Sequence, residues 1–246
     1  MKYLNLIILA LLSANSINTF ANEHSMWSYE GSGAPSNWGK LSPDFNQCGA
    51  GVNQSPINIT APLNAHLMPL HLQFSDTSFT EINNGHTIQI SDISANTLTL
   101  DNDLFSLQQF HFHTPSENTF DGKHFPLEAH FVYKNKEGDI AVVAVMYRSG
   151  DENIGLKTLW QNMPIKLGGK ATVKQKLNLE NLFPSDFSYY RFSGSLTTPP
   201  CTEGVRWLVL KHPMTISEQQ MEKFTNMMHH HNNRPLQPLD GRVIVE

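Results

Sequence analysis

Apolar and polar residues alternate along much of the middle of this chain, which is the pattern of half-buried β-strands. Segments 70–74, 86–90 and 97–100 show the two-residue period clearly. Segments 139–147 and 205–210 are more continuously apolar, so we place them in the centre of a sheet. Turn-forming sequences rich in Asn, Asp and Gly separate these runs. The pattern predicts a mainly β chain.

Few helices are expected. Ser217 and Gln220 form a capping-box pattern ahead of an apolar stripe at helical spacing, and a second short helix is predicted over residues 153–162. No Ser/Gly linker, charge block or repeat divides the chain. The sequence therefore predicts one α+β domain, with an antiparallel or mixed sheet and short peripheral helices.

The first 21 residues have the organisation of a secretory signal peptide. Lys2 is followed by a short apolar run (3–12), a polar stretch (13–19) and a small residue, Ala21. The apolar run is about half the roughly 20 residues needed to span a membrane. We expect cleavage after Ala21, leaving a domain over 22–246 with no membrane span. The expected location is the periplasm, with secretion as the alternative.

The charges are scattered along the chain. It contains 17 Lys and Arg against 22 Asp and Glu, a net charge of −5. Nucleic-acid binding would require clustered basic residues, so nucleic acid is not an expected partner.

The two cysteines, Cys48 and Cys201, would lie in a compartment where disulfides persist. A bridge between them is the favoured interpretation, and two buried free thiols are the alternative. The bridge would close a loop of about 150 residues, for which loop entropy suggests roughly 4–5 kcal/mol of stabilisation.

The strongest candidate site lies in residues 109–113. Alternate side chains of a strand share a face, so Gln109, His111 and His113 point the same way. A second predicted strand places Glu128 and His130 on one face in the same manner, and a hairpin-like return would bring His130 beside the first pair.

Three neutral imidazoles with one open position are typical of catalytic zinc, whereas structural zinc sites are closed by four protein ligands. Ligating histidines usually donate their other N–H to a carbonyl or carboxylate, and Gln109 and Glu128 are placed to accept. The run His229-His230-His231 ends a predicted helix, where consecutive side chains diverge. We therefore interpret it as surface.

Several motifs closely resemble those of the alpha-class carbonic anhydrases, and they occur in that family's order from about Trp27 to Arg242. Besides the ligand strands, they are Trp27-Ser28-Tyr29-Glu30-Gly31 with Trp38, Gln54-Ser55-Pro56-Ile57-Asn58-Ile59, Asn83-Asn84-Gly85-His86, Ser195-Leu196-Thr197-Thr198-Pro199-Pro200-Cys201 and Asn233-Arg234-Pro235. The resemblance implies a central, twisted, largely antiparallel sheet of about ten strands. It also implies a Cys48–Cys201 bridge and cis bonds at Ser55-Pro56 and Pro199-Pro200.

The same resemblance implies site roles. His111, His113 and His130 would hold Zn²⁺, with a carbonyl near Asn232 orienting His113. His86 would be the proton shuttle. Thr197 would accept a hydrogen bond from zinc-bound hydroxide and donate one to Glu117, since an ionised carboxylate can only accept. The remaining positions would form the substrate pocket: Val132, Val142, Leu196, Thr198, Val205 and Trp207.

The reaction implied is the reversible hydration of carbon dioxide to bicarbonate and a proton, by attack of zinc-bound hydroxide. Carbon dioxide is a poor electrophile toward neutral water, so a metal must make hydroxide available. An unperturbed imidazole pKa near 6.5 would suit His86 to proton transfer. The protein would be a monomer or a homodimer.

Two positions depart from the family pattern: Asn118, where members often carry His, and Thr114, where animal members usually carry Trp. Both are expected beside the chemistry rather than in it, and they point to a bacterial, exported type of member. One alternative is a cupin-like metal oxygenase with Glu117 as fourth ligand, but no second cupin motif is found. The other is a non-catalytic binding domain of the same fold. Such relatives typically lack a zinc histidine, and all three are present here.

Overall fold

The computed structural model describes residues 27–246, so the predicted signal peptide over 1–21 lies outside the described residues. The strands are β1 (Asn58–Ile59), β2 (His71–Gln73), β3 (Thr77–Asn83), β4 (Ile88–Ser91), β5 (Thr97–Leu100), β6 (Asp103–His113), β7 (Thr119–Phe120), β8 (Leu127–Lys134), β9 (Ile140–Ser149), β10 (Lys170–Leu177), β11 (Tyr189–Ser195), β12 (Glu203–Leu210) and β13 (Met214–Ile216). The α-helices are α1 (Trp38–Leu41), α2 (Gln47–Ala50), α3 (Ile154–Gln161) and α4 (Glu218–Met228). Short 3₁₀-helices cover Gly31–Gly33, Pro35–Asn37, Pro43–Phe45 and Leu179–Leu182.

Among the described residues, one large sheet joins eleven strands in the main order β10-β3-β4-β6-β8-β9-β12-β11, with β2, β5 and β13 pairing beside this path. Its pairs are antiparallel except where β12 and β13 run parallel to β9. A separate two-stranded parallel pair joins β1 to β7. The prediction of a mainly β domain with a largely antiparallel sheet of about ten strands is confirmed.

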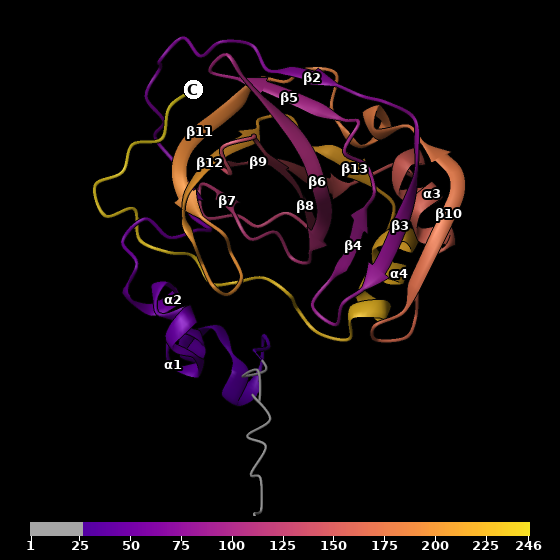
Figure 1. Cartoon of the computed structure of the whole chain (residues 1–246), viewed down its shortest axis with the longest axis horizontal. Coiled ribbons are helices and arrows are strands. Elements are labelled where there is room, and N and C mark those ends of the chain that lie inside the picture. The colour runs from indigo at the N-terminus through magenta and orange to yellow at the C-terminus, as the bar shows by residue number, and fades with distance from the viewer. Residues whose placement is uncertain (1–26) are drawn as a thin grey trace, which may run out of the picture.

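Strand β9 shows how this sheet is buried on both faces. Ala141, Val143 and Val145 point into the larger hydrophobic core, which α3 and α4 cover. Val142 and Ala144 point into a smaller core on the opposite face. In Figure 1, α3, α4 and β10 lie along one side of the molecule, and α1 and α2 lie near the N-terminal end. The predicted placement of residues 139–147 in the centre of the sheet is correct.

The two predicted helices are present and their N-termini are tied together. Ser217 and Gln220 form the expected capping box of α4, and Asn153 caps α3. The Gln220 side chain also accepts from the Asn153 N–H at 2.9 Å and donates to its carbonyl at 2.7 Å. One glutamine therefore satisfies polar groups at the starts of both helices, where backbone N–H groups lack helical partners.

Cys48 and Cys201 form the predicted disulfide, with their Cα atoms 5.0 Å apart. Both expected cis bonds, Ser55-Pro56 and Pro199-Pro200, are present, and Thr114-Pro115 is a third that the sequence analysis did not anticipate. None of the helices in residues 27–246 combines the length and apolar character needed to cross a bilayer.

Candidate metal centre

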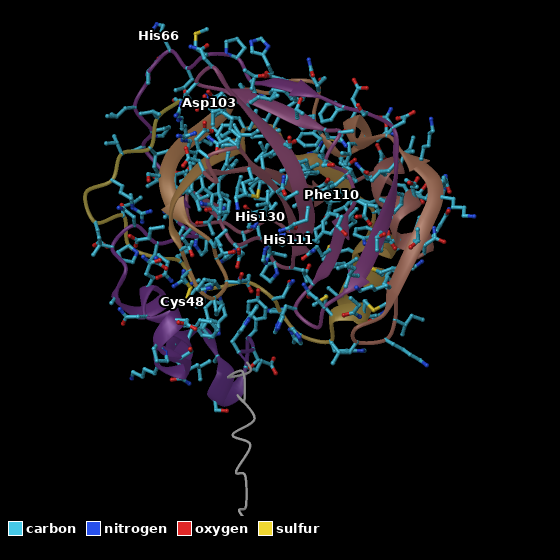
Figure 2. All side chains as sticks on the ribbon, viewed as in Figure 1. Cys48, His66, Asp103, Phe110, His111 and His130 are labelled. Carbon is cyan, nitrogen blue, oxygen red and sulfur yellow. A yellow bond between two sulfur atoms is a disulfide. The ribbon has the colours of Figure 1, made fainter. Side chains whose placement is uncertain are left out.

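The pairing of β6 with β8 places the three candidate ligands. His111 lies directly opposite His130, and His113 lies opposite Glu128. The intervening residue of β6, Phe112, points into the larger core on the other face. In Figure 2, His111 and His130 lie close together on one side of β6, with Phe110 on the other. The predicted hairpin-like return of the third histidine is therefore confirmed.

The three rings converge on a small volume. Their centroids are 5.0 Å apart for His111 and His113, 5.5 Å for His111 and His130, and 4.5 Å for His113 and His130. One nitrogen from each ring lies within 4.8 Å of the other two. Within residues 27–246 no other set of three metal-binding side chains converges in this way.

Hydrogen bonds fix which nitrogen of His111 and His113 faces that volume. The His111 Nδ1 atom is 2.8 Å from Gln109 Oε1, and His113 Nδ1 is 2.7 Å from the Asn232 carbonyl. Both oxygens can only accept, so each Nδ1 carries the hydrogen. The lone pair then lies on Nε2, which is left free to coordinate. The expected carbonyl partner for His113 is confirmed.

His130 is oriented by Glu128. Its Nε2 atom lies 2.9 Å from Glu128 Oε1, although the contact is too bent for a regular hydrogen bond. The other Glu128 oxygen accepts from the N–H groups of Glu117 (2.7 Å) and Asn118 (2.9 Å), and the Asn118 amide donates to Oε1 at 2.7 Å. This buried carboxylate is therefore held from several sides, and His130 is left with Nδ1 toward the other rings.

Burial keeps all three imidazoles neutral. It lowers the pKa of His113 and holds the pKa values of His111 and His130 well below their ordinary range, with neighbouring histidines adding to the effect in those two. Neutral imidazole is the form that binds zinc. The buried Nε2 of His113 has no hydrogen-bond partner among the described residues. Three convergent, neutral, pre-oriented nitrogens fit Zn²⁺ with an open fourth position.

Glu117 lies beside the rings, with Oε2 3.5 Å from His113 Nε2 and 3.8 Å from His130 Nδ1. It is outside the group of mutually close ligand atoms, which disfavours the cupin interpretation with Glu117 as fourth ligand. Burial raises the pKa of Glu117 well above its usual value, against the lowering effect of the N–H of Arg234, which donates to Oε1 at 2.8 Å. The Thr197 hydroxyl also lowers the pKa of Glu117. Its contact with the Glu117 carboxyl group does not meet the geometry of a regular hydrogen bond.

An apolar row lies next to the histidines on the same face of the sheet. Val132 of β8 is two residues from His130, and it faces Val142 of β9, which in turn faces Trp207 of β12. The Trp207 ring is 4.9 Å from that of His130. Leu196 and Val205 belong to the same small core. The five apolar residues thus belong to one cluster beside the histidines.

A cavity of about 110 Å³ opens in front of the site. Its lining includes five predicted site residues: His86, Gln109, His111, His113 and Thr198. His86 is half-buried at the edge, where its ring stacks on Trp27 with centroids 3.6 Å apart. The pKa of His86 is lowered, chiefly by burial and further by His230.

Some residues that shape the site were not assigned a role from the sequence. The Asn232 side chain accepts from Thr114 N at 2.7 Å and donates to the carbonyls of Phe112 and His86, at 2.8 and 2.9 Å. Asn118 contacts Glu128 directly. No local pattern marks either residue, and the partners of Asn232 are distant in sequence. In the run 229–231, interpreted as surface, His229 and His231 are exposed, and His230 is half-buried with its ring centroid 6.0 Å from that of Tyr29.

Comparison with known proteins gives a consistent family. The profile of the family described as "Eukaryotic-type carbonic anhydrase" matches residues 33–246. A carbonic anhydrase of Pectobacterium atrosepticum is 53% identical over 237 residues, covering 96% of this chain and 97% of that protein. One of Klebsiella pneumoniae is 52% identical over 240 residues, covering 97% and 96%. The alpha-carbonic anhydrase of Thermovibrio ammonificans, solved with sulfanilamide, has a TM-score of 0.89 at 44% identity, covering 90% of this chain and 99% of that one.

Proposed function

This chain belongs to the alpha-class, eukaryotic-type carbonic anhydrases, and we propose that it performs their reaction at the buried histidine centre between β6 and β8. The reaction is the reversible hydration of carbon dioxide to bicarbonate and a proton, and zinc is the metal. The observation that carries the proposal is the convergence of three neutral imidazoles whose coordinating nitrogens lie within 4.8 Å of one another.

We assign His111 and His113 as ligands through Nε2 and His130 as a ligand through Nδ1. Zinc held by three imidazoles activates water as a nucleophile near neutral pH, the behaviour for which carbonic anhydrase is itself the standard example. Gln109, Glu128 and the Asn232 carbonyl fix the ring orientations. Fixed ring orientation and tautomer favour metal binding because little reorganisation is then required.

We assign Thr197 to orient the nucleophile. Its hydroxyl is the donor for Glu117 Oε2, a buried oxygen without a regular hydrogen-bond partner among the described residues. When Glu117 is ionised it can only accept, so a hydroxyl that donates to it can only accept from the nucleophile, which therefore keeps one orientation. The next residue, Thr198, lines the cavity in front of the histidines.

The apolar cluster beside the histidines is the proposed site for carbon dioxide. Val132, Val142 and Trp207 stand in register next to the ligand row, with Leu196 and Val205 in the same core. An apolar surface holds a small uncharged gas close to the nucleophile without strong binding, which favours turnover.

His86 is the proposed proton shuttle. It borders the cavity that also contains His111 and His113, and its backbone N–H donates to Asn84 Oδ1 at 2.9 Å. Each turnover releases a proton. An imidazole at this edge accepts that proton on a ring nitrogen and passes it on toward solvent.

We propose export to the periplasm, with removal of residues 1–21 leaving a domain over 22–246. The Cys48–Cys201 disulfide supports this, because such bonds persist outside the cytosol. Sequencing the N-terminus of protein purified from a periplasmic extract tests it, and a start at Asn22 is expected. The expected assembly is a monomer or a homodimer, which sedimentation would distinguish.

Stopped-flow hydration of carbon dioxide with a pH indicator tests the function. The zinc-loaded protein should hydrate carbon dioxide rapidly, lose the activity when a chelator removes the metal, and regain it with zinc. A zinc-loaded protein without activity would support the binding-domain alternative, and failure to bind zinc would refute the histidine site.

A further inference from the structure

We propose that His230 is a second proton-relay residue, which takes protons from His86 at the mouth of the site and releases them to solvent. The inference rests on the proposed function, since it concerns the proton that His86 is assigned to carry. It concerns one member of the run 229–231 that the proposed mechanism leaves without a role.

His86 and His230 approach the same tyrosine. The ring centroid of Tyr29 is 6.5 Å from that of His86 and 6.0 Å from that of His230. The segment carrying His230 is also fixed to His86, because the Asn232 amide, two residues further on, donates to the His86 carbonyl at 2.9 Å. Two half-buried imidazoles therefore lie near the same tyrosine, at the rim of the cavity that Tyr29 and His86 line.

The ring of His230 is prepared to accept a proton. Its Nδ1 atom lies 2.9 Å from the His231 carbonyl, and a carbonyl can only accept, so Nδ1 carries the hydrogen in the neutral ring. The lone pair is then on Nε2, which has no hydrogen-bond partner among the described side chains of this rim and is free to take an incoming proton.

The two histidines also interact electrostatically. Positive charge on His230 adds to burial in lowering the pKa of His86, which is the behaviour of close, like-charged groups. Tyr29 stays neutral between them, because burial, with the nearby Glu117 carboxylate, raises its pKa well above the usual value. His229 and His231 are exposed beside this rim. Proton transfer between two imidazoles requires little driving force because the donor and the acceptor are the same chemical group.

The test compares His230→Gln with His231→Gln, which removes an exposed imidazole from the same segment. Proton release follows bicarbonate release, so it affects kcat and leaves kcat/KM unchanged. In zinc-loaded protein at low buffer concentration, His230→Gln should lower kcat severalfold with kcat/KM preserved, and added imidazole should restore kcat. His231→Gln should behave as the unchanged protein does.

A second readout is independent of activity. In an NMR titration, His230→Gln should raise the pKa of His86, because it removes a neighbouring positive charge, and His231→Gln should not. An unchanged kcat at low buffer, an equal fall in kcat and kcat/KM, or an unaltered His86 titration would each overturn the relay while leaving the proposed function intact. Absence of carbon dioxide hydration in the unchanged protein would overturn the proposed function itself.

Discussion

His113 on β6 donates from Nδ1 to the main-chain carbonyl of Asn232, which lies 2.7 Å away and 119 residues later in the chain. The Asn232 side chain is fully buried and fixes this contact by bonding to the backbone on both sides of His113, at Phe112 and Thr114. The orientation of one ligand in the sheet therefore depends on a segment outside it.

Replacing Asn232 with alanine should weaken zinc binding about 10- to 100-fold, the usual cost of losing a group that orients a metal ligand. The carbonyl remains in the variant, but the side-chain contacts that position it are lost. Competition with a chelator measures the affinity. Asn233→Ala changes the adjacent, half-buried residue and should bind zinc normally. Equal zinc affinity in both variants would show that the Asn232 side chain does not position His113.

Thr197→Val should lower kcat/KM for carbon dioxide hydration by roughly 10²-fold, since it removes a positioned hydrogen-bonding group without changing the volume of the side chain. Zinc affinity should stay the same, because Gln109, Glu128 and the Asn232 carbonyl, rather than Thr197, orient the three ligands. Stopped-flow kinetics and chelator competition measure the two quantities. Thr202→Val, at an exposed position in the same loop, is the matched control. A parallel loss of zinc affinity would instead place Thr197 in the support of the metal.

Periodicity predicted the strands whose two faces differ in polarity. The expected strand over 97–100 coincides with β5, and the His111, His113 and His130 pattern placed the ligands on one face of β6 and β8. Such patterns are local, so a sequence displays them directly. The family resemblance was needed to assign roles to Thr197 and His86. Thr197 lies in a loop, and His86, at the start of the expected strand over 86–90, lies in the turn before β4.

Strands whose two faces do not differ clearly in polarity were not predicted from the sequence. In β3 the buried residue Glu81 carries a carboxyl group. It interrupts the alternation of apolar and polar residues that would have marked this strand. Strand β10 pairs only with β3 and keeps most of its side chains exposed. The contacts of Asn232 also join segments far apart in the chain, and only the folded structure brings those partners together.

Removing the disulfide should destabilise the protein by about 2–5 kcal/mol. Cys48 and Cys201 are separated by 153 residues, so the bond excludes many unfolded conformations. The double variant with serine at both positions should unfold at lower urea concentration than the oxidised parent. Reductant should bring the parent close to the variant and leave the variant unchanged. Equal urea midpoints for the oxidised parent and the variant would contradict this expectation.

Glu81 should make stability fall as pH rises. Its side chain is fully buried and neither oxygen has a hydrogen-bond partner among the described residues. Burial raises the pKa of Glu81 to about 8, and Lys223 offsets this only in part. The ordinary value, 4.5, applies when the chain is unfolded, so the folded state binds the proton more tightly. The contribution of protonated Glu81 to the free energy of unfolding is therefore complete below pH 4.5. It is lost as the pH rises toward 8, by about 1.4 kcal/mol for each pH unit.

Glu81→Gln keeps the shape of the protonated side chain and removes its titration. The variant and the parent should have similar unfolding free energies near pH 4.5, with the variant progressively more stable up to pH 8. Urea unfolding of chelator-treated protein at a series of pH values measures the difference in unfolding free energy between the variant and the parent. The ligand histidines titrate in both proteins, so their contribution cancels in this difference. Glu222→Gln, at an exposed position on α4, should leave the pH dependence of the parent unchanged. A constant difference between Glu81→Gln and the parent across this range would show that Glu81 is ionised in the folded protein, and hence that a cation or water stabilises its buried charge.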